Sequence, residues 1–144
     1  MSEKIKTLIK RLAPLLDENS DVFRELETFF SAEGKIDIHL GDLGKFLKNN
    51  RTYQVVRING NSYKDCVYDL VDNHPELMEA IGMLRYYKAP AGSIKWEDVE
   101  AAEIAMGNEL TVNAYGWAPD AWTLFESDGS EHGLVAIVAL DSLL

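Results

Sequence analysis

Three glutamates follow one another at three-residue spacing in the last third of the chain, at Glu97, Glu100 and Glu103. In a helix this spacing places them near one another on one side, where their mutual repulsion costs roughly a few tenths of a kcal/mol. After Lys95 no Lys or Arg occurs to offset them. The row can attract a basic partner and speed its encounter, or it is a solvated face that keeps the protein soluble. Both interpretations stay open on the sequence.

Aromatic residues lie in the same acidic region, at Tyr115, Trp117 and Trp122. On a strand, Tyr115 and Trp117 would share one face, because strand side chains alternate. Trp and Tyr beside acids resemble an interface hot spot for a basic protein, although large aromatics are more often core. The sequence thus predicts a partner-binding surface with six candidate residues: Glu97, Glu100, Glu103, Trp117, Asp120 and Trp122.

The three histidines are His39, His74 and His132, and they fall in different expected elements. Only the fold could bring them together, so a small cytosolic enzyme that uses a histidine with carboxylates remains the alternative function. Cys66 lies in an apolar helical stripe, which predicts a buried and unreactive thiol. A single cysteine excludes a secreted scaffold held by disulfides.

The known catalytic and cofactor motifs are missing from the sequence. It holds no phosphate-binding P-loop, no Gly-x-Gly-x-x-Gly, no Gly-x-Ser-x-Gly and no His-Glu-x-x-His. Residues 127–132 lack the ligand spacing of a calcium loop and are better explained as a hairpin turn. We therefore expect no cofactor and no metal, and we favour a protein that is not an enzyme.

Charge is unevenly distributed within the formal net charge of −10. Residues 1–90 carry 13 bases and 14 acids, whereas residues 91–144 carry one base and ten acids. Such an acidic region repels polyanions, so we expect no direct binding of nucleic acid. No run approaches the length of a membrane span, and no signal-peptide core is present, so we expect a cytoplasmic protein. The basic first helix could lie on a membrane surface, but packing on the core is the simpler interpretation.

Apolar periodicity predicts most of the secondary structure. Residues 5–16 and 22–30 show helical spacing, with Pro14 expected to kink or end the first helix and a polar link at residues 17–20, which predicts a helical hairpin. The further segments are predicted as follows: strand 35–40, short helix 43–47 capped by Asp42, strand 52–58, a turn at Asn59-Gly60, helix 63–71 capped by Ser62, helix 75–87, helix 96–106, and strands 110–117, 122–127 and 134–140.

The run 134–140 is apolar at all seven positions, which predicts a strand buried on both faces at the centre of the sheet. Helical and strand segments occur in separate blocks, so we predict the α+β class. The expected architecture is a single domain, residues 1–144, in which an N-terminal helical hairpin and further helices pack on a small, mainly antiparallel sheet with a buried C-terminal strand.

The sequence favours a non-enzymatic, acidic protein-binding domain. Its partner would be a basic protein surface, and an inhibitor of a nucleic-acid-handling protein fits that chemistry. An immunity protein against a nuclease toxin is one such inhibitor, and a phage or plasmid anti-defence protein is another. The oligomeric state is left open by the sequence.

Overall fold

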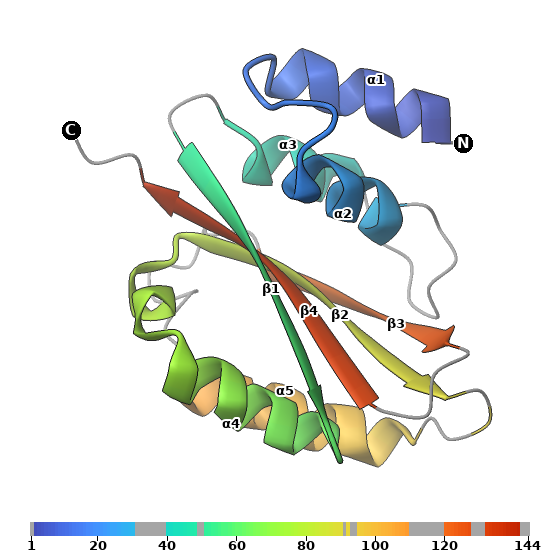
Figure 1. The fold of residues 1–144 in the computed structure, drawn as a ribbon, viewed down its shortest axis with the longest axis vertical. Coiled ribbons are helices and arrows are strands. Elements are labelled where there is room, and N and C mark those ends of the chain that lie inside the picture. The colour runs from blue at the N-terminus through green and yellow to red at the C-terminus, as the bar shows by residue number, and fades with distance from the viewer. Residues whose placement is uncertain are drawn as a thin grey trace.

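A four-stranded sheet carries helices on both faces in the computed structural model, which describes residues 2–30, 40–48, 51–90, 92, 95–109, 120–127 and 132–141 (Figure 1). The helices are α1 Ser2–Leu12, α2 Asp21–Phe30, α3 Leu40–Phe46, α4 Tyr63–Asn73, the 3-10 helix η1 Pro75–Glu79, and α5 Trp96–Glu109. The strands are β1 Arg51–Gly60, β2 Gly82–Pro90, β3 Asp120–Ser127 and β4 His132–Asp141.

The strand order is β1-β4-β2-β3. Strand β4 pairs antiparallel with both β1 and β2, whereas β2 and β3 are parallel. The predicted α+β class and the mainly antiparallel sheet are confirmed. The parallel pair exists because α5 carries the chain from the end of β2 back to the start of β3, as a parallel connection requires.

Strand β4 is buried on both faces, and its alternating side chains supply both cores. Leu134, Ala136 and Val138 belong to the core beneath α4 and α5. Val135 and Ile137 belong to the core beneath α1, α2 and α3. The predicted central strand is confirmed, because a strand between two neighbours and two helical layers has no solvent-facing side.

The first two helices form as the apolar spacing predicts. Helix α1 ends at Leu12, two residues before Pro14, which has no N–H for a helical hydrogen bond. Ser20 begins α2 as its cap, since its Oγ accepts a hydrogen bond from the Phe23 N–H at 3.2 Å. Helix α3 begins at Leu40, so Asp42 lies inside this helix and the predicted cap at that position is wrong.

The predicted helix over residues 75–87 is wrong beyond Glu79. Pro75 does start a helical turn, but only the five-residue η1 forms, and residues 82–90 are strand β2. Residues Gly82–Tyr87 are all buried. A short apolar run of this kind fits a strand covered on both faces as well as it fits a buried helix. Pairing with β4 and β3 decides the conformation.

Several predicted features lie outside the described residues. They are the body of the strand predicted at 35–40, the strand predicted at 110–117, the turn at 128–130 and Trp117. Leu40, the last residue of the first of these strands, is helical. Among the described residues, no helix is both long enough and apolar enough to span a membrane.

Candidate partner-binding face

Helix α5 exposes two of the three predicted glutamates. Glu97 and Glu100 are exposed, while Val99, Ala102 and Met106 are buried against the sheet. Glu97 and Glu100 are one turn apart, so their carboxylates lie on the same side of the helix. These two residues keep the role of candidate binding residues.

Glu103 is different, because it points to the sheet. The Arg85 Nε donates a hydrogen bond to Glu103 Oε2 at 2.8 Å, and a second bond joins Arg85 Nη2 to Oε1. The Tyr87 hydroxyl also donates to Oε2, and Arg85 is only 3% exposed. Glu103 therefore secures α5 to β2, and its prediction as an unneutralised surface acid is wrong: its base comes from 18 residues earlier in the chain.

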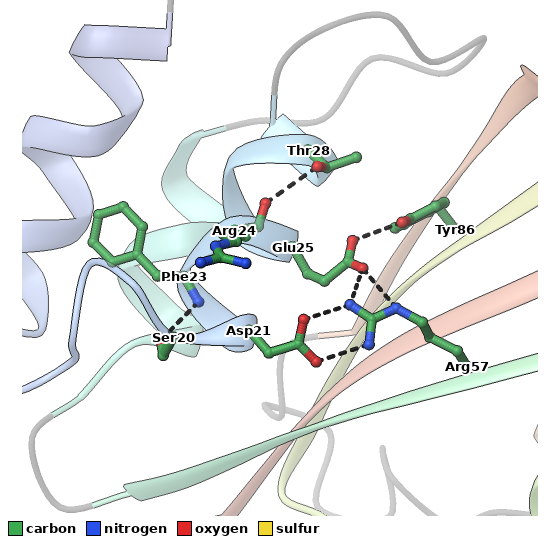
Figure 2. A network of polar contacts seen from close by, with 8 residues as sticks. All are labelled: Ser20, Asp21, Phe23, Arg24, Glu25, Thr28, Arg57 and Tyr86. Atoms are coloured by element: carbon green, nitrogen blue, oxygen red, sulfur yellow. Dashed lines mark hydrogen bonds and ion pairs between the residues drawn. The ribbon is translucent and has the colours of Figure 1, made fainter.

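A second polar cluster on the other face of the sheet again joins an arginine, a tyrosine and a glutamate, with Asp21 in addition (Figure 2). Arg57 of β1 donates to Asp21 Oδ2 at 2.7 Å and to Glu25 Oε2 at 3.0 Å, both on α2. The Tyr86 hydroxyl donates to Glu25 Oε1 at 2.6 Å. Burial, and then the hydrogen bond to Glu25, raise the pKa of Tyr86 far above its usual value, so its proton stays in the hydrogen bond. This cluster secures α2 to the sheet.

Helix α5 also exposes large apolar side chains. Trp96 is 48% exposed and Ile104 is 65% exposed, although helical spacing alone would group Trp96 with the buried Val99. With Glu100 between them, Trp96 and Ile104 recur at four-residue steps and form one stripe along the helix. The stripe combines apolar contact area with a carboxylate.

Helix α4 lies beside α5 on the same face of the sheet and extends this surface (Figure 1). Tyr68 is 40% exposed, and the Lys64 Nζ lies 6.0 Å from its ring centroid. We call the exposed acidic, aromatic and aliphatic side chains of the two helices the acidic layer, and its members are Asp65, Tyr68, Asp69, Asp72, Trp96, Glu97, Asp98, Glu100 and Ile104. The exposed residues of this surface include six carboxylates but only two lysines, Lys64 and Lys95. Of the four large apolar side chains exposed in the described part of the chain, three belong to this layer.

The remaining predicted residues are not joined to this layer by any described side chain. Asp120 is the first residue of β3, opposite Met83 of β2, and Trp122 follows it opposite Arg85. These pairings place their backbones at the edge of the sheet, and their side chains lie outside what the structure describes. Helical spacing places Trp96 in line with Glu100. No signal in the sequence, however, separates an exposed Trp from a core Trp.

The histidines in the described residues lie at opposite ends of α4. The His132 ring contacts Tyr63, the first residue of α4, with the centroids 4.9 Å apart. His74 follows the last residue of α4, and its Nδ1 lies 3.3 Å from Glu76 Oε1. The two contacts lie at opposite ends of α4, whose eleven residues span about 16 Å. In the described part of the chain, no group of three His, Cys, Asp or Glu residues could hold a metal ion.

Cys66 and Tyr63 lie on the buried side of α4 and form no exposed site. Cys66 is fully buried, as the sequence predicted, and burial raises the pKa of its thiol to about 11. Tyr63 is 1% exposed, and its hydroxyl has no hydrogen-bond partner among the described residues. Burial, followed by the charge of Asp98, raises the pKa of this hydroxyl to about 12.

Comparison with known proteins establishes only the fold of the chain. No protein-family model matches the chain, and no curated protein matches it. Among solved structures, the FtsZ W319Y mutant of M. jannaschii is similar at 15% identity with a TM-score of 0.56, over 81% of this chain and 35% of that one. TubZ of Bacillus thuringiensis serovar israelensis, in a GTPγS-form protofilament, is similar at 13% identity with a TM-score of 0.52, over 99% of this chain and 48% of that one. The chain spans less than half the length of either protein, and identities this low establish a shared fold and nothing further.

Proposed function

We propose that the protein is a non-enzymatic, cytoplasmic binding domain whose acidic layer docks on a basic protein surface. One observation carries the proposal: exposed carboxylates and exposed large apolar side chains occur together on α4 and α5. A face that served only solubility would need the carboxylates but not Trp96 and Ile104. An interface needs both, since charge guides the encounter and apolar area holds the complex.

The two kinds of side chain have separate roles in this mechanism. Glu97 and Glu100, with the acids of α4, attract a basic partner over distances up to about a Debye length, roughly 8 Å at physiological salt. Trp96 then contributes buried contact area in the docked complex. Charge accordingly governs the association rate, and Trp96 governs the dissociation rate.

The partner class we propose is a nucleic-acid-handling protein, because such proteins present the basic surfaces that the acidic layer would occupy. The protein would act as an inhibitor, as an immunity protein or an anti-defence protein does. Duplex DNA should then compete with the domain for the partner, while the domain itself should not shift DNA in a gel at low salt. A gel shift with sub-micromolar domain alone would contradict the proposal.

The experiment compares three baits in an extract of the source cells: wild type, the Glu97→Lys/Glu100→Lys variant, and a Glu3→Lys/Glu27→Lys control that changes the net charge equally outside the acidic layer. Basic proteins retained by wild type and control, but not by the α5 variant, are the expected result. With such a protein in hand, the α5 variant should associate at least about tenfold more slowly at low salt. Trp96→Ala should mainly speed dissociation, by about tenfold.

Equal retention by all three baits would mean that the acidic layer is a solvated surface and that the proposal fails. Circular dichroism of each variant verifies that the fold survives. The enzymatic alternative would need one histidine beside carboxylates in a pocket. Of the two described histidines, His74 contacts Glu76 on the surface and His132 packs against Tyr63.

A further inference from the structure

A small basic corner lies on the other side of the molecule, where α3 passes into β1 and the loop after α1 lies against them. Its hollow, about 90 Å³ in volume, is lined by residues that we call the corner: Ala13, Leu15, Leu16, Lys48, Arg51 and Tyr53. Two of the six are bases and none is an acid. The corner shares no residue with the acidic layer, so an inference about it does not depend on the proposed function.

The guanidinium of Arg51 is held in one orientation by the end of α3. Its Nη1 donates hydrogen bonds to the carbonyl oxygens of Lys45 and Phe46, at 2.7 and 2.9 Å. These bonds use one nitrogen only, and within the described part of the chain the N–H groups on Nε and Nη2 have no partner. Two parallel N–H donors on a fixed fork match the two oxygens of a carboxylate.

Tyr53 holds the backbone of Lys48 as well. The Tyr53 hydroxyl accepts a hydrogen bond from the Lys48 N–H at 2.7 Å and lies 3.0 Å from the Lys48 carbonyl oxygen. Lys48 is thereby set beside Arg51 with its side chain exposed. A fixed backbone lowers the ordering cost that a ligand would have to offset.

The apolar side of the corner is exposed without cover from the described residues. Leu15 is 85% exposed, the largest exposed fraction among the large apolar side chains that the structure describes, and Leu16 beside it is half-buried. The hollow is about the size of one aliphatic side chain. A ligand that fits both parts has a carboxylate and, next to it, a branched aliphatic group.

We propose that the corner docks a peptide segment of another protein in which an acidic residue adjoins a leucine. The acidic side chain binds the free N–H groups of Arg51 and the ammonium group of Lys48, and the leucine enters the hollow beside Leu15 and Leu16. Charge complementarity selects this occupant over a second copy of the chain, whose net charge of −10 repels its own kind. The apolar hollow selects it over nucleic acid, which offers phosphates but no aliphatic group.

The experiment titrates the full chain with an acetylated, amidated hexapeptide, Gly-Ser-Glu-Leu-Ser-Gly, and follows backbone amide signals by NMR. Saturable shifts at Leu15, Leu16, Lys48 and Arg51 are the expected result. Replacing the peptide's Glu by Gln should weaken binding at least about fivefold, because a charge-assisted pair is lost. Replacing its Leu by Ala should weaken binding by a similar factor.

Variants of the protein test the same contacts from the other side. Lys48→Glu and Leu15→Ser change exposed side chains, so the fold survives, and each should weaken binding at least about fivefold. Arg51→Lys keeps the charge but loses the fork, and should bind less well than wild type. The Glu27→Lys change on α2 is the control and should leave binding unchanged.

Four outcomes would overturn the proposal. The first is equal binding of the Glu and Gln peptides. The second is binding only by a peptide that ends in a free leucine carboxylate, which would identify a chain terminus as the ligand. The third is binding only after residues 142–144 are deleted, which would mean that the chain's own leucines fill the hollow. The fourth is a shift pattern that moves with protein concentration in the absence of peptide, which would identify a second copy as the occupant.

Discussion

The two faces of the sheet use the same three groups to hold their helices, but at different depths. On the α5 side, Arg85 and Tyr87 bind Glu103; on the α2 side, Arg57 and Tyr86 bind Glu25 and Asp21. The Arg85 side chain is 4% exposed, whereas that of Arg57 is 48% exposed and is shared by two carboxylates. The same polar chemistry therefore occurs in a buried form around Arg85 and in a solvated form around Arg57. The cost of breaking each should follow that difference.

Glu103→Ala should give the largest effect. It removes a carboxylate that forms two hydrogen bonds with Arg85, a residue that is 3% exposed, and such a loss costs about 3 kcal/mol or more. Urea unfolding followed by circular dichroism measures it. Glu25→Ala should cost less, about 1–2 kcal/mol, because Arg57 keeps Asp21 and water. Equal losses for the two variants would show that depth does not decide the cost.

Removing the tyrosine hydroxyls should have an intermediate effect on the free energy of unfolding and sharpen the comparison of the two clusters. Tyr86→Phe and Tyr87→Phe each lose one hydrogen bond to a carboxylate and should cost about 1–2 kcal/mol in the free energy of unfolding. Tyr63→Phe is the matched control, because its buried hydroxyl has no partner in the described part of the chain. It should leave stability unchanged or raise it. A loss from Tyr63→Phe as large as the other two would contradict this assignment.

The smallest effect should come from Asp21 and depend on pH. Hydrogen bonds from Arg57 hold the pKa of the Asp21 carboxyl below its ordinary value of 3.8. A depressed folded-state pKa contributes stability above the unfolded-state pKa, and this contribution is lost as the pH falls through the folded-state pKa. Asp21→Asn should thus be slightly less stable than wild type at neutral pH and equal to it in strong acid. Thermal melts from pH 7 to pH 2 test this, and a constant difference over that range would contradict it.

The sequence predicted the elements whose pattern is local. The stripe of α2, the Ser62 cap of α4 and the apolar run of β4 each depend on neighbours within a few residues, and all three are confirmed. The prediction for β2 was wrong because its apolar residues also fit a helix. Only its pairing with β4 distinguishes a strand from a helix there. Pairing is a contact over some fifty residues of sequence, which periodicity does not report.

The candidate site shows the same division. Exposure of Glu97 and Glu100 follows from helical spacing and is confirmed, but Glu103 belongs to the same row and is held by Arg85. The base that neutralises Glu103 cannot be found by counting charges along one helix. The Arg51 fork is equally invisible, because its orientation depends on carbonyl oxygens at the end of α3.

The central place of β4 has a consequence for the order in which the chain can fold during synthesis. Strand β4 is the last of the four to leave the ribosome, yet it separates β1 from β2 and supplies side chains to both cores. Until residue 141 emerges, β1 has no described strand to pair with, and the parallel pair of β2 and β3 lacks its antiparallel neighbour. The nascent chain must therefore carry exposed apolar faces until β4 has emerged. Contacts distant in sequence then dominate folding, which slows it.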